Sequence, residues 1–169
     1  VVYLANDGGV FRSLDGGEPW TRTLSSARCT DLAFHPLNPN VIYTTVWGYG
    51  LYKSTNLGST WTQVTSPGIP TSGVTRGAVA TTNGNGSGRM YVAFAGYDYR
   101  VQGVYLCWDL EGNTWSTVTP PVEYMWGQGW YNNMVVVSPT NNGAVLVGGG
   151  SLWVSYTGGA EWQQHTSYP

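Results

Sequence analysis

Ser13-Leu14-Asp15-Gly16-Gly17-Glu18-Pro19-Trp20 is the first of four similar segments in this chain. Its spacing returns in Ser54-Thr55-Asn56-Leu57-Gly58-Ser59-Thr60-Trp61 and in Ser155-Tyr156-Thr157-Gly158-Gly159-Ala160-Glu161-Trp162. The fourth segment, Trp108-Asp109-Leu110-Glu111-Gly112-Asn113-Thr114-Trp115, keeps only the glycine and the tryptophan in register. The shared pattern is Ser-x-(Asp/Asn/Thr)-x-Gly-x-x-Trp, and we call these segments the repeated turns. Their recurrence predicts a fold built from small sheets that repeat one unit.

The repeated turns begin at residues 13, 54, 108 and 155, so the intervals between them are 41, 54 and 47 residues. Four-stranded propeller blades have about 40 to 50 residues in known repeat families. The long second interval contains the polar, glycine-rich segment 81–88, which we interpret as an inserted loop. The period therefore predicts an all-β fold, a β-propeller of four-stranded antiparallel blades.

Short runs of β-branched and aromatic residues separate the turn signals, and no segment has a convincing helical period. We therefore expect almost no helix. The approximate blades are residues 1–28, 29–70, 71–120 and 121–169. The first blade lacks an inner strand, because Val1–Ala5 matches the second strand of the other blades. The prediction is an open arc of about four blades or part of a larger ring, and a closed four-bladed ring is the alternative.

Each fixed position of the repeated turns suits a structural role. The short polar side chain can accept backbone N–H bonds, the glycine permits positive φ, and the tryptophan can lie between neighbouring sheets. Asn56 and Thr157 replace the aspartate in sister copies, which argues against catalysis or metal binding there. We assign structural roles to Ser13, Asp15, Gly17, Trp20, Ser54, Asn56, Gly58, Trp61, Gly112, Trp115, Ser155, Thr157, Gly159 and Trp162.

These turns and the units around them resemble the Asp-box repeat, or BNR repeat, of sialidases, xyloglucan-degrading endoglucanases and sortilin-type receptor ectodomains. Residues 2–13 and 38–43 are especially similar to xyloglucanase-type propellers. The resemblance implies a sialidase-like or glycoside hydrolase-like propeller that is secreted or exposed on the cell surface. It also implies a ligand face opposite the repeated turns. Because the matching residues belong to the blade architecture, the resemblance does not assign an activity.

Composition argues against several other classes of function. Seven basic and nine acidic residues give a net charge of −2, without the basic stripe that nucleic acid requires. No apolar run approaches the roughly 20 residues of a membrane span. The two histidines and two cysteines lack metal-ligand spacing, so we expect no metal and no cofactor. Cys29 and Cys107 fall in different blades, which favours two buried thiols over a disulfide.

The loops opposite the repeated turns carry many aromatic residues beside amides and carboxylates. This combination suits a sugar, which has an apolar face and a hydroxyl rim. The alternative is that the rings fill the axial channel or cover the next blade. The ligand-binding candidates are Trp47, Tyr49, Tyr97, Tyr99, Arg100, Tyr124, Trp126, Trp130 and Tyr131.

Hydrolysis of a glycosidic bond normally uses two carboxylates that flank the bond. The acids on the candidate face are Asp7, Asp98 and Glu123, and Asp98 with Glu123 is the pair to test first. The alternatives are that Asp98 is only the ion partner of Arg100 and that Glu123 is only solvated. A complete catalytic set is not visible.

The leading hypothesis is a propeller segment that binds a carbohydrate or a protein through its aromatic loops, without catalysing a reaction itself. The second hypothesis is a fragment of a xyloglucanase-like or sialidase-like glycoside hydrolase. The third is a structural subunit that assembles through open blade edges. The expected partners include remaining blades from the same parent chain or from another subunit.

Overall fold

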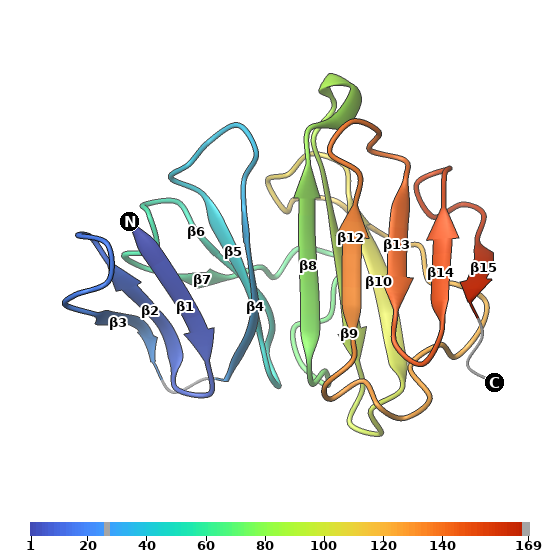
Figure 1. The fold of residues 1–169 in the computed structure, drawn as a ribbon, viewed down its shortest axis with the longest axis horizontal. Coiled ribbons are helices and arrows are strands. Elements are labelled where there is room, and N and C mark those ends of the chain that lie inside the picture. The colour runs from blue at the N-terminus through green and yellow to red at the C-terminus, as the bar shows by residue number, and fades with distance from the viewer. Residues whose placement is uncertain (26–27, 167–169) are drawn as a thin grey trace.

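The computed structural model describes residues 1–25 and 28–166, and these residues form four antiparallel sheets. The sheets follow one another in chain order across the molecule (Figure 1). The first sheet contains β1 (Val2–Asn6), β2 (Gly9–Ser13) and β3 (Thr21–Ser25). The second contains β4 (Cys29–Phe34), β5 (Ile42–Val46), β6 (Gly50–Ser54) and β7 (Thr62–Gln63).

The third and fourth sheets each have four strands. The third contains β8 (Gly77–Thr82), β9 (Arg89–Ala95), β10 (Val101–Cys107) and β11 (Trp115–Thr117). The fourth contains β12 (Met134–Val137), β13 (Val145–Gly148), β14 (Leu152–Ser155) and β15 (Gln163–Thr166). In the described part of the chain, the one helical segment is the 3₁₀ turn η1 (Gly84–Gly86). The predicted insertion at 81–88 is therefore shorter, because Thr81 and Thr82 extend β8.

Neighbouring sheets repeat the same contacts. The inner strand β4 lies against β8, and β8 lies against β12. The strands β1, β5 and β9 also lie against the inner strand of the next sheet, which is β4, β8 and β12 respectively. Repetition of one contact geometry turns each sheet by a similar step about a common axis. The first and fourth sheets stand at opposite ends of this arrangement (Figure 1), which confirms the prediction of an open all-β arc.

The hydrophobic core lies between the sheets, in separate clusters. One cluster joins the second and third sheets and includes Tyr43, Val92 and Trp115. Another joins the third and fourth sheets and includes Tyr91 and Val147. A smaller cluster lies between the first and second sheets. Each sheet is therefore stabilised mainly by the apolar surface that it buries against its neighbours.

The polar side chains of the repeated turns bind their own backbone. Ser54 Oγ accepts the Gly58 N–H at 2.9 Å, and Asn56 Oδ1 accepts the Thr60 N–H at 2.9 Å. The last turn repeats this pattern with Ser155 as the acceptor for Gly159 and Thr157 as the acceptor for Glu161. Threonine can replace the acid because the position requires only a short acceptor.

In the repeated turn that contains Trp108–Trp115, the alignment of the sequence with the other three turns was wrong. Strand pairing places Cys107 opposite Met90, as it places Ser54 opposite Ile42, so Cys107 occupies the serine position. Its Sγ donates to Asp109 Oδ1 at 2.9 Å, in the manner of Ser13 Oγ and Asp15 Oδ1 at 2.8 Å. The turn therefore begins with Cys107 and Asp109, and one extra residue precedes its tryptophan. Matching the glycine and the tryptophan concealed this register.

The tryptophans of the turns differ in their surroundings. Trp61 Nε1 donates to Thr23 Oγ1 of the first sheet at 3.1 Å, and Trp162 Nε1 donates to the Val118 carbonyl at 2.8 Å. Trp115 is only 6% exposed, within the core between the second and third sheets. Trp20 is 40% exposed, so the prediction of an intersheet position is wrong for Trp20. Trp20 directly precedes β3, the outer strand of the first sheet, and no sheet precedes the first one among the described residues.

Both cysteines are buried and form no disulfide, which confirms the interpretation as two thiols. Burial raises the pKa of Cys29 to about 11. Burial and, next, the bond to Asp109 raise the pKa of Cys107 to about 11. Both side chains therefore remain protonated near neutral pH.

Candidate functional site

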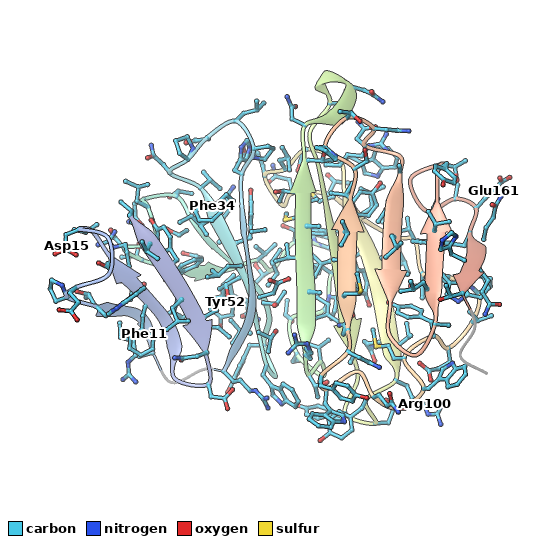
Figure 2. The ribbon with its side chains drawn as sticks, viewed as in Figure 1. Phe11, Asp15, Phe34, Tyr52, Arg100 and Glu161 are labelled. Carbon is cyan, nitrogen blue, oxygen red and sulfur yellow. The ribbon has the colours of Figure 1, made fainter. Side chains whose placement is uncertain are left out.

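The candidate face is the end of the arc opposite the repeated turns. Figure 2 shows Arg100 at the lower end, whereas Asp15 and Glu161, which belong to repeated turns, lie higher in the view. The loops β1–β2, β5–β6, β9–β10 and β13–β14 reach this lower end, as do the connections from one sheet to the next. The antiparallel strands thus place 6–9, 47–49, 96–100 and 118–133 at one end of a rigid scaffold.

A cluster of charged and aromatic side chains crosses three sheets on this face. Asp7 Oδ1 of the β1–β2 loop pairs with Arg28 Nε at 2.8 Å. The Arg28 guanidinium lies 4.3 Å from the centre of the Trp47 ring, which is a cation–π distance. The Trp47 ring lies 6.3 Å from the Tyr99 ring of the β9–β10 loop. Sequence reasoning missed Arg28, a single basic residue before β4 whose role depends on the neighbouring loops.

The β9–β10 loop presents two tyrosines. Gly96 N–H donates to the Arg100 carbonyl at 2.9 Å, and Tyr99 N–H donates to the Gly96 carbonyl at 3.0 Å. Tyr99 has a φ of 62°, an uncommon conformation for a residue with a side chain. Its carbonyl accepts the Gly129 N–H at 2.8 Å, which ties this loop to the next connection. The Tyr97 side chain is 66% exposed beside it.

The long β11–β12 connection adds three more exposed rings. Trp130 and Tyr131 meet edge to face with their centroids 4.5 Å apart, and the Tyr131 hydroxyl donates to Gln128 Oε1 at 2.8 Å. Trp126 has a φ of 56° and is exposed. Trp126, Gln128, Tyr131 and Gly150 line a shallow pocket of about 200 Å³. We call the rings of this face the aromatic surface, which comprises the half-buried Trp47 and the exposed Tyr49, Tyr97, Tyr99, Trp126, Trp130 and Tyr131.

The three candidate acids all have partners in the fold. Glu123 Oε1 accepts the N–H groups of Val101 at 3.2 Å and Met125 at 2.9 Å, and Glu123 Oε2 pairs with Arg100 Nη1 at 3.2 Å. Asp98 Oδ1 accepts the Arg100 N–H at 3.1 Å. Arg100 therefore forms its ion pair with Glu123 rather than with Asp98, and Glu123 is not simply solvated. Through the bond to the Val101 N–H, Glu123 connects the β11–β12 connection to the start of β10.

Tyr124 does not belong to the aromatic surface, so the prediction that it binds a ligand is wrong. Its side chain is fully buried in the core between the third and fourth sheets. Its hydroxyl has no hydrogen-bond partner among the described residues, and burial, followed by the charge of Glu123, raises its pKa. The sequence does not separate Tyr124 from the neighbouring exposed rings, because one irregular connection carries them all.

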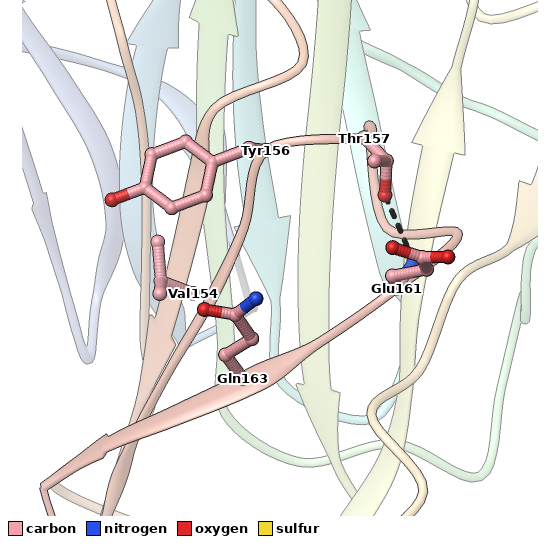
Figure 3. A pocket seen from close by; sticks show the side chains of 5 residues that line it. All are labelled: Val154, Tyr156, Thr157, Glu161 and Gln163. Carbon is pink, nitrogen blue, oxygen red and sulfur yellow. Dashed lines mark hydrogen bonds between the residues drawn. The ribbon is translucent and has the colours of Figure 1, made fainter.

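A different pocket lies at the last repeated turn (Figure 3). Its lining includes Val154, Tyr156 and Gln163, and Thr157 Oγ1 accepts the Glu161 N–H at 2.9 Å across it. Its volume of about 50 Å³ is well below the roughly 300 to 1,000 Å³ of typical ligand pockets. Among residues 1–25 and 28–166, no group of three or more His, Cys, Asp or Glu side chains is arranged to hold a metal ion. The same residues include no helix long and apolar enough to cross a membrane.

Neither a family model nor a curated protein matches this sequence. Solved structures do match its fold, and an ancestral GH74 enzyme aligns with a TM-score of 0.76 at 24% identity over 99% of this chain. The chain is an arc of a β-propeller. The GH74 xyloglucanase from Xanthomonas campestris aligns at a TM-score of 0.69 and 18% identity over 96% of the arc.

A third similar structure is YCF48 bound to D1 peptide, with a TM-score of 0.58 and 14% identity over 84% of the arc. The arc spans only 22% of the ancestral GH74 chain, 27% of the Xanthomonas chain and 42% of the YCF48 chain. At these identities the likeness establishes the propeller fold, whereas a function has to be argued from the site.

Proposed function

We propose that this propeller arc binds a polysaccharide through its aromatic surface. The observation that carries the proposal is the gathering of aromatic rings from the β5–β6, β9–β10 and β11–β12 connections at one end of the arc. Flat rings flanked by amides and by Arg28 and Arg100 offer both stacking surfaces and hydrogen-bond donors to a sugar chain. Likeness to GH74 propellers, one of them a xyloglucanase, supports a glucan as the ligand class.

The proposed role is binding without hydrolysis by this arc itself. Asp7, Asp98 and Glu123 each hold a loop through an ion pair or a backbone N–H bond. A general acid or base must also lie within hydrogen-bond reach of the glycosidic oxygen or the attacking water. The second candidate is a part of a glycoside hydrolase whose catalytic set includes residues from other blades, and the GH74 likeness favours it.

Three further features belong to the same proposal. The repeated turns are proposed to be Asp-box turns, and the bonds of Ser54, Asn56 and Thr157 support this. A polysaccharide ligand agrees with a secreted or cell-surface location. Further blades, from the same parent chain or another subunit, are the proposed neighbours of the arc. A protein ligand is the alternative to a polysaccharide, supported by the YCF48 structure with its peptide.

Affinity electrophoresis in gels containing xyloglucan, mixed-linkage glucan or mannan tests the binding role. We expect at least one glucan to retard the protein, and Tyr97→Ala to weaken that binding about tenfold through loss of one stacking ring. Tyr156→Ala is the matched control, because Tyr97 and Tyr156 are both 66% exposed but lie at opposite ends of the arc. Absence of retardation in every gel, or equal losses in the two variants, would refute the proposal.

Release of reducing sugar from the same polysaccharides tests for catalysis. We expect no release by the wild-type arc. Release that disappears in Asp98→Asn or Glu123→Gln would establish the glycoside hydrolase candidate in place of the binding role. Circular dichroism of both variants would show whether the loops retain their fold, since Glu123 has a positioning role.

A further inference from the structure

Three asparagines of this chain are followed directly by glycine, in the pairs Asn83-Gly84, Asn85-Gly86 and Asn142-Gly143. In such a pair, the glycine nitrogen can attack the carbonyl carbon of the asparagine side chain, because a residue without Cβ leaves the approach open. The attack requires the glycine N–H to leave its hydrogen bond and the backbone of the asparagine to rotate. The fold therefore decides which of the three pairs can react.

The Asn83-Gly84 pair lies in the packed base of the β8–β9 loop. The Gly84 N–H donates to Thr82 Oγ1 at 3.0 Å, and Thr82 is only 2% exposed. Thr82 Oγ1 in turn donates to the Ser138 carbonyl at 2.7 Å. A Cβ on Gly84 would stand 2.7 Å from the backbone nitrogen of Asn141, so the backbone here has little room to rotate. Attack by Gly84 would require this loop to separate from the β12–β13 turn.

The Asn142-Gly143 pair is held from both sides. Asn142 is 6% exposed, its Nδ2 donates to the Ser87 carbonyl at 2.7 Å, and its own carbonyl accepts the Tyr91 hydroxyl at 2.8 Å. The Gly143 N–H donates to Asn141 Oδ1 at 3.0 Å. Neither the side-chain amide of Asn142 nor its backbone can turn without breaking buried bonds.

The Asn85-Gly86 pair occupies the exposed tip of the same β8–β9 loop, in the 3₁₀ turn η1. Figure 1 shows η1 projecting above the upper end of β8. Both residues of the pair are exposed, and a Cβ on Gly86 would meet no atom within 4 Å. The Gly86 N–H is held within the turn, by a bond of 3.0 Å to the Asn83 carbonyl. Local opening of an exposed turn releases such a bond at little cost in free energy.

We propose that Asn85 is a deamidation site, at which the chain modifies itself with solvent water as the only co-reactant. The Gly86 nitrogen forms a bond to Asn85 Cγ, and the Cγ–Nδ2 bond breaks. Ammonia leaves with the proton that Gly86 N loses, and a five-membered succinimide remains. Water then opens either carbonyl of this ring and gives aspartate or isoaspartate, without any change in oxidation state. The product adds one negative charge to a chain whose net charge is −2.

The site lies at the end of the arc that carries the repeated turns. The aromatic surface occupies the opposite end, so the inference is independent of polysaccharide binding. Because the tip of the loop packs against no sheet, the product should leave the core intact.

Peptide mapping of the aged, folded chain by mass spectrometry tests the proposal. Trypsin releases residues 77–89 as one peptide, in which fragment ions separate Asn83 from Asn85, and chymotrypsin provides a peptide that contains Asn142. We expect deamidation at Asn85 to be at least about tenfold faster than at the other two sites, a difference of about 1.4 kcal/mol in opening free energy. Equal rates at the three sites of the folded chain, or an unmodified Asn85, would overturn the proposal.

The same chain unfolded in guanidinium chloride is the reference for the effect of the fold. Without the packed base of the loop, the three Asn-Gly pairs should react at comparable rates. A ranking that persists unchanged in the unfolded chain would assign the selectivity to the local sequence and contradict the structural argument. In the folded chain, the rate at Asn85 should rise between pH 6 and pH 9, because Gly86 N must lose its proton. A rate independent of pH would exclude this attack.

Two variants identify the acidic form that accumulates in isoelectric focusing. Asn85→Gln should prevent its accumulation, because a glutamine would have to form a six-membered ring, which closes far more slowly. Asn40→Gln is the matched control, since Asn40 is also exposed but precedes Val41, whose branched side chain hinders the approach of its nitrogen. The control should acidify as fast as the wild type, and the acidic band should migrate with Asn85→Asp. Acidification at the wild-type rate in Asn85→Gln would refute the proposed site.

Discussion

The two ends of the arc contain the same kinds of residue in different states. At the end with the repeated turns, Ser54 and Asn56 bind their own backbone, and Trp61 and Trp162 donate to neighbouring segments. At the opposite end, the backbone and Glu123 hold the loops, while Tyr97 and Trp130 remain exposed. A tryptophan or tyrosine is thus structural where the next sheet covers it and available for recognition where loops leave it uncovered.

Trp115 and Trp130 provide the strongest test of this contrast. Trp115→Ala should lower the free energy of unfolding by about 3–5 kcal/mol, because it leaves a cavity between the second and third sheets. Trp130→Ala should change it by less than about 1 kcal/mol, because Trp130 is 49% exposed. Urea unfolding followed by circular dichroism measures both values. Similar losses in the two variants would mean that the aromatic surface is part of the core.

Two buried tyrosines sharpen the comparison at the level of one hydroxyl group. The Tyr43 hydroxyl donates to the Leu110 carbonyl in the repeated turn of the next sheet. Tyr43→Phe should therefore cost about 1–3 kcal/mol, because the buried carbonyl loses its partner. Tyr124→Phe should be neutral or stabilising, because it removes a buried hydroxyl that has no partner. Urea unfolding of the two variants checks the sign of this difference.

The smallest effects are expected within the repeated turns. Ser54→Ala removes the acceptor for the Gly58 N–H and should cost about 1 kcal/mol. Cys107→Ser should change stability by less than that, because a hydroxyl at this position can donate to Asp109 as Ser13 donates to Asp15. A large loss for Cys107→Ser would contradict the register assigned to the fourth turn.

The pH dependence of the stability of Cys107→Ser tests the environment of the same position. Burial and then the bond to Asp109 raise the pKa of the Cys107 thiol from 9.0 to about 11, so the unfolded chain releases this proton first as the pH rises. The thiol therefore lowers the free energy of unfolding progressively as the pH rises from about 9 to about 11. Urea unfolding at pH 8 and pH 10.5 should show a smaller decrease for Cys107→Ser than for the wild type.

Much of the fold could be predicted from local sequence patterns. The short runs of β-branched and aromatic residues between turn signals predict strands, and β6 (Gly50–Ser54) and β14 (Leu152–Ser155) are two of them. The predictions that were wrong concern relations between distant segments. The burial of Tyr124 and the exposure of Trp20 depend on which sheet lies beside each ring, and the pairing of Arg100 with Glu123 depends on which loops meet.

The sequence by itself determined the period of the sheets, the chemistry of the turns and the all-β character of the arc. These properties follow from the alternation of side chains and from backbone preferences within a few residues. Only the tertiary structure decided which rings remain exposed and which acids hold loops. Each of those outcomes depends on contacts between blades, and such contacts form between residues that lie far apart along the chain.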